Sequence, residues 1–291
     1  MKILFAADLH LNIPDPSRRT GRTTFGAFAE SVVAENPDAV VIGGDIGVPE
    51  RAGDYLLAIR RVVGDRPLAL CLGNHDFWVP PWMKSEFSSL QEVIERYWSF
   101  PAREVGAVLL DEGNADLGEL IVAGGYGHFD LGLAVPDLHL RGNRITERVY
   151  LAGIGWNDFV RIPNCATRLQ VEAREQAAGI AKRVDEAIGS KKRVLVAIHT
   201  CPWRELNGHP LTGGVEDILS AYSGNSMVGL ELEQRASAIE FLMCGHTHMP
   251  VRERKMHGIA QVLNVGTDYG YFRGVIYDTS DRLVRWVGEQ F

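Results

Sequence analysis

The sequence predicts a layered α/β fold built on largely parallel strands, and three observations support this. Short apolar runs alternate with longer amphipathic stretches, the pattern of βαβ units rather than of hairpin-rich β proteins. Pro37 and Pro67 each stand between a helical pattern and the next apolar run, where proline ends helices. Polar residues directly follow several apolar runs, and ligands of open α/β sheets bind at that carboxyl edge.

In the first half of the chain, strands and helices are expected to alternate. Residues 2–7, 39–42 and 68–72 are short apolar runs typical of buried strands. Helices are expected at 23–36 and 52–63, and a third at 85–97. Two further strands are predicted, at 108–110 and 120–123.

The second half opens with an irregular stretch and then returns to regular structure. Residues 124–164 are Gly-rich and show no periodicity, which indicates an insertion between regular elements. A long helix is expected at 166–188. Strands are then predicted at 193–198, 240–244, 261–265, 274–277 and 283–287, the last two joined by a hairpin turn at 278–281. We expect one domain over residues 1–291.

Bulk properties restrict the class of protein. A chain of 291 residues with 46% hydrophobic and 23% charged residues is typical of a globular protein. A net charge of −7 argues against a broad basic surface for nucleic acid. No apolar run has the length of a membrane span. Four cysteines without a CxxC pair favour a reducing compartment, so we expect a cytoplasmic protein.

Carboxylates, histidines and one asparagine gather at the predicted strand ends. Asp and Asn oxygens with His nitrogens suit divalent first-row metal ions, and no thiolate pattern indicates a structural zinc site. Outside these strand ends, His128, His139, His209 and His257 are expected to be ordinary core or surface residues. The sequence therefore predicts a metal site at the carboxyl ends of the strands, where Asp8, His10, Asp45, Asn74, His75, His199, His246 and His248 gather.

In order along the chain these segments form a recognisable signature. They are Asp8-Leu9-His10, Gly44-Asp45, Gly73-Asn74-His75-Asp76, His199 and Gly245-His246-Thr247-His248. The set resembles the calcineurin-like metallophosphoesterase superfamily, whose motifs are DxH, GD, GNHD, H and GHxH. The resemblance implies a four-layer α/β/β/α sandwich that hydrolyses phosphate esters with two divalent metal ions and a bridging hydroxide. Mn²⁺ is the first expectation, with Fe, Zn, Ni or Co as alternatives.

The resemblance also implies a role for each motif residue. Asp8, His10 and His248 would bind one metal, and Asn74, His199 and His246 the other. Asp45 would bridge the two ions. His75 corresponds to the family's acid rather than to a ligand, with Asp76 as its orienting partner. Two divalent cations against two carboxylates would leave the inner site net positive, which favours an anionic substrate.

The insertion at 124–164 falls where the family varies most and where its substrate caps are found. Aromatic residues beside polar groups suit recognition of a leaving group. The alternative is an irregular loop in which the aromatic side chains simply pack. The substrate-binding candidates in this insertion are His128, Phe129, Asp130, Trp156 and Asp158.

Departures from related signatures narrow the expected reaction. The run Gly44-Asp45-Ile46-Gly47-Val48 lacks the arginine of the protein phosphatase motif GDxxDRG. It also lacks the tyrosine of purple acid phosphatases, since Val48 takes that place. We therefore expect a phosphodiesterase acting on a small phosphate ester, with a phosphomonoesterase or a nuclease as alternatives. A non-catalytic scaffold is disfavoured because every ligand position and His75 are retained. Membrane and nucleic-acid partners are not expected, and the sequence leaves the oligomeric state open.

Overall fold

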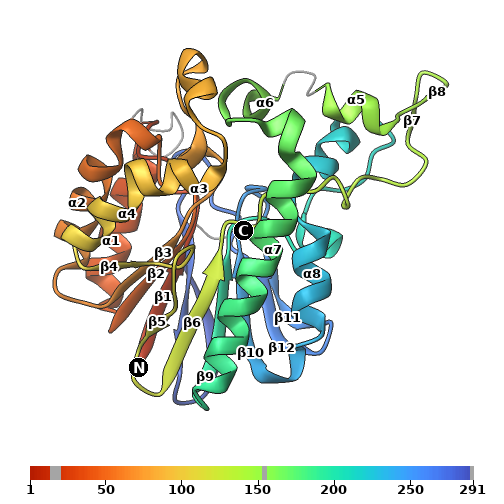
Figure 1. Ribbon diagram of the computed structural model, residues 1–291. Helices are drawn as coiled ribbons and strands as arrows, with labels where there is room; N and C mark the ends of the chain where they lie inside the picture. The colour runs from red at the N-terminus through yellow and green to blue at the C-terminus, as the bar shows by residue number, and fades with distance from the viewer. Residues whose placement is uncertain (14–20, 153–155, 289–291) are drawn as a thin grey trace.

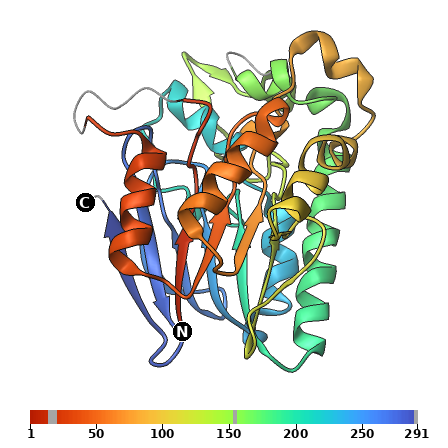
Figure 2. The ribbon, with the colours of Figure 1, turned by 90° about the vertical axis from the view of Figure 1, so that its left-hand side faces the viewer.

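The computed structural model describes residues 1–13, 21–152 and 156–288 (Figure 1). Two six-stranded sheets face each other, and helices cover the outer face of each (Figures 1 and 2).

The strands are β1 Lys2–Ala6, β2 Ala39–Gly43, β3 Leu68–Cys71, β4 Ala107–Leu109, β5 Ala115–Asp116, β6 Leu120–Gly125, β7 His139–Leu140, β8 Asn143–Arg144, β9 Arg193–Ile198, β10 Ile239–Cys244, β11 Val251–Met256, β12 Ile259–Asn264, β13 Arg273–Asp278 and β14 Leu283–Gly288. The helices are α1 Thr24–Glu35, α2 Ala52–Val63, α3 Leu90–Val93, α4 Ser99–Glu104, α5 Glu147–Leu151, α6 Asn157–Arg161, α7 Cys165–Gly189 and α8 Ser226–Glu233.

Both sheets have a parallel centre. The first has the order β14-β13-β1-β2-β3-β4, in which β1 to β4 are parallel, β13 is antiparallel to β1, and β14 is antiparallel to β13. The second has the order β11-β12-β10-β9-β6-β5, with β6, β9, β10 and β12 parallel. The carboxyl ends of the central strands therefore meet at one end of the molecule, the top in Figure 1.

Side chains along each strand point alternately to the space between the sheets and to the outer helices. In β1, Ile3 and Phe5 pack between the sheets, while Leu4 packs under the helices of the outer layer. In β9, Leu195 packs between the sheets, while Val196 faces the cluster that contains α7 and α8 residues. Side chains of successive strand residues point to opposite faces, so strands buried on both faces produce this four-layer α/β/β/α arrangement. The predicted fold class is confirmed.

The expected strands and helices occur with shifts of a few residues, except the third helix. The prediction of a helix at 85–97 is wrong in its bounds. Ser89 accepts a hydrogen bond from the Glu92 amide and so begins the helix at Leu90. A π-helical turn, Ile94–Trp98, then joins α3 to α4. The sequence patterns did not reveal β5, β11, α8 or the short elements β7, β8, α5 and α6 within residues 124–164.

Two further findings concern the sequence-based expectations about compartment and membrane. All four cysteines are buried and unpaired. Within the described ranges, no helix has both the length and the apolar character needed to cross a membrane. The compartment stays a prediction.

Candidate metal centre

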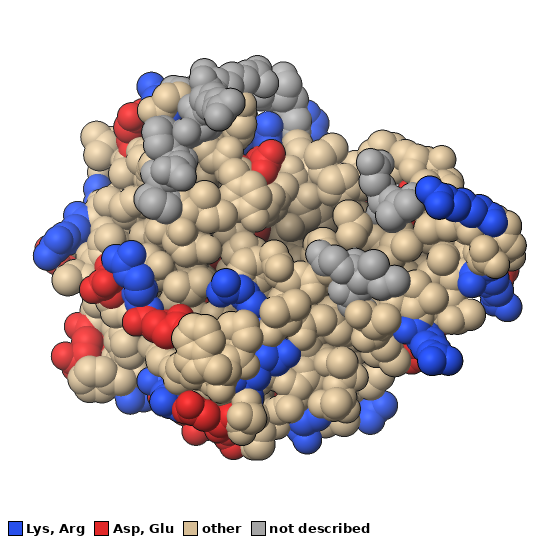
Figure 3. Space-filling view, turned by 90° about the horizontal axis from the view of Figure 1, so that it is seen from above, with Lys and Arg blue, Asp and Glu red and all other residues tan. Residues whose placement is uncertain are grey.

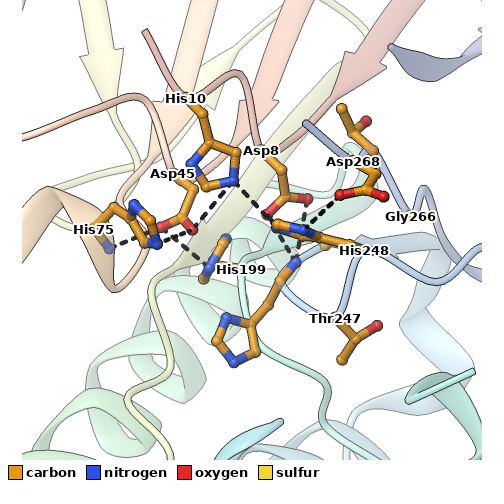
Figure 4. Close-up of polar contacts among 12 residues, drawn as sticks. Asp8, His10, Asp45, His75, His199, Thr247, His248, Gly266 and Asp268 are labelled. Atoms are coloured by element: carbon orange, nitrogen blue, oxygen red, sulfur yellow. Dashed lines mark hydrogen bonds and ion pairs between the residues drawn. The ribbon is translucent and has the colours of Figure 1, made fainter. Parts of the chain in front are cut away.

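The predicted ligand residues lie in loops that leave five parallel strands. Asp8 and His10 follow β1, Asp45 follows β2 and Asn74 follows β3, all from the first sheet. His199 follows β9 and His246 and His248 follow β10, from the second sheet. The site therefore lies where the two sheets meet at their carboxyl edge, and the imidazole rings surround the two carboxylates there (Figure 4).

A first ligand group consists of Asp8, His10, Asp45 and His248, whose ligand atoms all lie within 4.8 Å of one another. The Nε2 atoms of His10 and His248 are 3.1 Å apart. His10 Nε2 lies 3.8 Å from Asp45 Oδ2, and His248 Nε2 lies 3.8 Å from Asp8 Oδ1. Such converging nitrogens and oxygens surround one point where a cation can be held.

A second ligand group consists of Asp45, Asn74, His199 and His246. Asn74 Oδ1 lies 3.1 Å from His199 Nε2 and 3.0 Å from His246 Nδ1. His199 Nε2 is 3.4 Å from Asp45 Oδ1, whereas the first group faces Asp45 Oδ2. The two oxygens of one carboxylate thus belong to two different ligand groups.

Three of the predicted ligand histidines are oriented by a contact at the ring nitrogen that faces away from the centre. His199 Nδ1 is 2.8 Å from the Gly43 carbonyl, and His246 Nε2 is 2.9 Å from the Tyr222 carbonyl. His248 Nδ1 is 3.3 Å from Asp268 Oδ1. A carbonyl or carboxylate oxygen accepts a hydrogen bond from the ring N–H, so in the neutral imidazole the opposite nitrogen directs its lone pair toward the centre. Metal-ligating histidines are typically held in this way.

The backbone of the site is strained. Positive φ angles occur at Asp8 (56°), His10 (45°), Asp45 (53°), His246 (72°) and His248 (58°). A non-glycine residue in the left-handed region costs of order 1–3 kcal/mol, and such residues cluster at functional sites. Five of the seven predicted ligands carry this cost. The loops therefore adopt unfavourable backbone angles that position these side chains at the centre.

Two motif glycines permit the close approach of backbone to the carboxylates. A Cβ atom at Gly73 would lie 2.3 Å from Asp45 Oδ1, and one at Gly245 would lie 2.5 Å from Asp8 Oδ2. Both distances are well inside van der Waals contact. Any side chain at either position would displace a ligand carboxylate.

The electrostatics of the centre favour a bound cation. Burial raises the pKa of Asp8 to about 7. Burial and the neighbouring carboxylates of Asp8 and Asp76 raise the pKa of Asp45 well above its usual value. Burial, with nearby imidazoles, lowers the pKa values of His10 and His199. A divalent ion requires neutral imidazoles and ionised carboxylates as donors, and it would supply the positive charge that these buried carboxylates lack. The residues present therefore fit such an ion.

Metal binding is therefore expected to stabilise the fold. At a free Mn²⁺ concentration about 100 times its dissociation constant, one site contributes about 2.7 kcal/mol. For a chain of this size that corresponds to a rise of roughly 4–5 °C in the unfolding midpoint. Differential scanning calorimetry of metal-free and Mn²⁺-loaded protein measures the effect. An unfolding midpoint that is identical in a chelator and in Mn²⁺ would contradict it.

His75 lies beside the ligand groups without belonging to either. It is 6% exposed, and its Nε2 is 3.9 Å from Asp45 Oδ2. The imidazole stacks on the Trp78 indole, with ring centroids 3.6 Å apart and planes inclined by 22°. Asp45 Oδ1 accepts a hydrogen bond of 2.9 Å from the His75 amide, which ties its backbone to the centre.

The contacts of Asp76 differ from those expected of a partner for His75. Its carboxylate accepts hydrogen bonds from the amides of Ile46, Gly47 and Gly73. These bonds join the loop after β2 to the loop after β3. We therefore revise the role of Asp76 from orienting the imidazole to holding together the two loops that carry Asp45 and Asn74.

A cavity of about 630 Å³ opens beside the ligand groups. Among the candidates from residues 124–164, Trp156 and Asp158 line it. Phe129 and His128 are fully buried, and His128 Nδ1 is 3.1 Å from the Tyr126 hydroxyl. Asp130 accepts hydrogen bonds from the Ser226 hydroxyl and the Met227 amide. The substrate role expected of His128, Phe129 and Asp130 is therefore replaced by packing and support within the fold.

Other parts of the site were missed by the sequence patterns. A second cavity wall comes from residues 207–223, including His209, which was expected to be an ordinary histidine. Tyr269 also lines the cavity, with its ring 4.6 Å from His10. Asp268, which contacts His248, and Tyr269 follow the strand β12, so the rule that polar residues at strand ends form the site would have identified this loop.

Comparison with known proteins follows this geometry. The model of the calcineurin-like phosphoesterase family matches residues 1–250. No curated protein sequence matches the chain. Among solved structures, the phosphopantetheinyl hydrolase of Mycobacterium tuberculosis is 16% identical with a TM-score of 0.64, and the match covers 92% of this chain and 90% of that one. The protein TT1561 of Thermus thermophilus is 13% identical with a TM-score of 0.53, and the match covers 99% of this chain and 98% of that one.

These two structures share the fold of this chain at low sequence identity. The family match extends over most of the chain and includes every motif that supplies a predicted ligand. A cluster of Asp and His side chains that can hold metal stands at the expected edge of the sheets. The chain belongs to the calcineurin-like phosphoesterase family.

Proposed function

We propose that this protein hydrolyses a phosphodiester at a centre of two divalent metal ions. One observation carries the proposal: Asp45 presents Oδ2 to the first ligand group and Oδ1 to the second. Two ions sharing a carboxylate would supply Lewis-acid stabilisation of the phosphate charge and an activated water for in-line attack. Mn²⁺ is the proposed native ion, since carboxylate and carbonyl oxygens suit it and imidazole is compatible.

His75 is proposed to protonate the departing oxygen. It is almost fully buried, and its Nε2 faces the carboxylate shared by the two ligand groups. The stacked indole of Trp78 restricts the imidazole to this orientation. A general acid must lie within hydrogen-bond reach of the leaving oxygen, and an ester held between the two ligand groups satisfies that requirement.

The lining of the cavity favours a diester over a monoester. None of the described lining residues is Lys or Arg, so the metals themselves would have to neutralise the phosphate charge. A diester carries one negative charge fewer than a dianionic monoester and needs less compensation. On the end of the molecule where the central strands finish, Lys and Arg are interspersed with Asp and Glu (Figure 3).

The size of the cavity supports an ester with a substantial organic group. A volume of about 630 Å³ lies in the range of pockets that enclose small organic ligands. Trp78 and Trp156 line it on the side of the second ligand group, and Tyr269 on the side of the first. Aromatic walls on both sides of the centre suit a substrate with an organic group on each side of the phosphorus.

The test is a screen of metal-loaded protein. Phosphomonoesters, cyclic nucleotides, dinucleotides and lipid phosphodiesters are compared in Mn²⁺ by their kcat/KM values, with chelated protein as the control. We expect hydrolysis of at least one diester class with a higher kcat/KM than any monoester. Turnover of monoesters alone would reject the phosphodiesterase assignment. Absence of turnover from protein that binds two metals would reject the proposed activity as a whole.

Trp156→Ala is expected to raise KM for the best diester about tenfold while changing kcat little. The indole lines the cavity, and contacts made equally in the ground and transition states affect binding rather than chemistry. A small generic diester, which does not reach the indole, should be hydrolysed as by wild type. Trp82→Ala is the matched control, because Trp82 is 80% exposed and does not line the cavity. Equal losses on both diesters would argue that Trp156 is only structural.

A further inference from the structure

Asp158 is a buried carboxylate that joins three parts of the site. It is 1% exposed and lies in α6, within residues 124–164. Its Oδ1 accepts hydrogen bonds of 3.0 Å from Asn74 Nδ2 and 2.6 Å from Trp78 Nε1. Its Oδ2 accepts one of 2.6 Å from Trp156 Nε1. With both oxygens engaged, the carboxylate is committed to protein donors rather than to a substrate.

The bond to Asn74 determines which end of the amide faces the metal centre. A carboxamide carries an acceptor oxygen and a donor nitrogen of similar size, and only the oxygen can coordinate a cation. Because Asp158 takes the Nδ2 hydrogen, Asn74 Oδ1 points toward His199 Nε2 and His246 Nδ1. Rotation of the amide would leave a buried carboxylate facing a carbonyl oxygen, which is unfavourable without a proton between them.

The other two bonds extend the same control to the wall of the cavity. The Trp78 indole that donates to Asp158 is the ring on which His75 stacks. The Trp156 indole lines the cavity and stacks on Tyr222, whose carbonyl lies 2.9 Å from His246 Nε2. One carboxylate therefore fixes a predicted metal ligand, the ring beneath the predicted acid and a wall of the cavity.

Asp130 provides an internal comparison. It is also a buried carboxylate of residues 124–164, and it accepts hydrogen bonds from Gly132, Ser226 and Met227. None of these donors is a ligand residue or lines the cavity. The two carboxylates thus share burial and the number of donor residues but differ in what their donors do.

We propose that Asp158 is a positioning residue that sets the affinity of the second ligand group for its metal ion by holding the Asn74 amide with its oxygen inward. The inference rests on the two-metal centre of the proposed function. It assigns the segment 124–164 a role in building the metal centre in addition to enclosing a substrate. Loss of such an outer contact typically costs 10- to 100-fold in metal affinity.

Asp158→Asn tests this, since it keeps the size of the side chain but removes the negative charge and one of the two acceptor oxygens. The donors of Asn74 and Trp156 then compete for the one oxygen that remains. We expect the second Mn²⁺ to bind about 10- to 100-fold more weakly while the first is held as in wild type. Calorimetric titration measures both affinities, and electron paramagnetic resonance distinguishes an isolated Mn²⁺ ion from a coupled pair. Asp130→Asn, the matched control, should bind both ions like wild type even if its unfolding midpoint falls.

A donor–acceptor exchange provides the rescue. Adding Asn74→Asp to Asp158→Asn restores a carboxylate–amide hydrogen bond with the roles reversed and leaves an oxygen toward the metal. This double variant should regain most of the lost second-site affinity. If Asp158→Asn does not fold, Asp158→Glu replaces it, because the extra methylene displaces the acceptor while the charge is kept.

The possible results distinguish failure of the positioning role of Asp158 from failure of the proposed two-metal centre. Second-site affinity in Asp158→Asn equal to wild type, or an equal loss in Asp130→Asn, would overturn the positioning role and leave the two-metal proposal intact. Wild-type protein that binds a single Mn²⁺ would overturn both.

Discussion

Replacing Asp45 by Asn is expected to weaken the binding of both metal ions and reduce kcat/KM by at least about 10³-fold. A metal centre supplies several kcal/mol of transition-state stabilisation, and each ~1.4 kcal/mol is a factor of ten in rate. Asp45 Oδ2 faces the first ligand group and Oδ1 the second, so one substitution reaches both ions. A neutral amide cannot present an anionic oxygen to each of them.

The two ions should not be lost equally. Asp45 Oδ1 accepts a hydrogen bond from the His75 amide, and the oxygen of the substituting Asn is expected to keep that bond. Its NH₂ group would then take the place of Oδ2, 3.8 Å from His10 Nε2, where it repels a cation. The first ligand group should therefore lose more affinity than the second.

Elemental analysis and calorimetric titration of Asp45→Asn measure this result. Asp130→Asn serves as the control for replacing a buried carboxylate outside the two ligand groups. Two tightly bound ions with normal turnover in Asp45→Asn would remove Asp45 from the centre and with it the observation on which the proposed function depends.

The convergence of the seven predicted metal ligands could be foreseen because each of these residues lies near the end of a strand. Asp8 and His199 directly follow regular apolar strands, and parallel strands bring such ends together without any knowledge of the loops between them. The layers could be predicted for the same reason, since the period of the hydrophobic pattern and the length of each apolar run distinguish buried strands from amphipathic helices. The motifs, their positions after the strands and the fold class could all be predicted because each depends on residues that are close together in the sequence.

The cavity could not be predicted in this way. Phe129 and Trp156 have similar sequence surroundings, yet Phe129 is fully buried and Trp156 lines the cavity. That difference depends on how residues 124–164 and 207–223 pack against each other, which no periodicity encodes. The role of Asp76 was obscured for a related reason: its partners are the backbone amides of Ile46, Gly47 and Gly73, and sequence does not indicate where an amide points.

His75→Asn is expected to keep both metal ions and lose about 10²- to 10⁴-fold of activity toward esters with alkoxide leaving groups. His75 belongs to neither ligand group, so its removal leaves their atoms in place. An alkoxide is a poor leaving group unless a proton reaches it, whereas a nitrophenolate departs readily without one. The loss toward nitrophenyl esters should therefore be much smaller.

The pH dependence of kcat should also differ between wild type and His75→Asn. Burial lowers the pKa of His75, so the imidazolium that donates the proton depends on the negative charge of the bound ester beside it. Wild-type kcat for alkoxide esters should fall as pH rises through the pKa of that complex, because only the protonated ring can donate. In His75→Asn this limb should be absent.

Trp78→Phe distinguishes proton donation from positioning. Phe removes the indole N–H that bonds to Asp158 but keeps an aromatic ring beneath His75, so positioning is altered while the acid remains. That variant should lose a similar, modest factor on both ester types and retain the pH limb. If His75→Asn instead loses metal, the residue is a ligand. If it loses the same factor on both ester types, the imidazole positions the substrate and the proton comes from elsewhere.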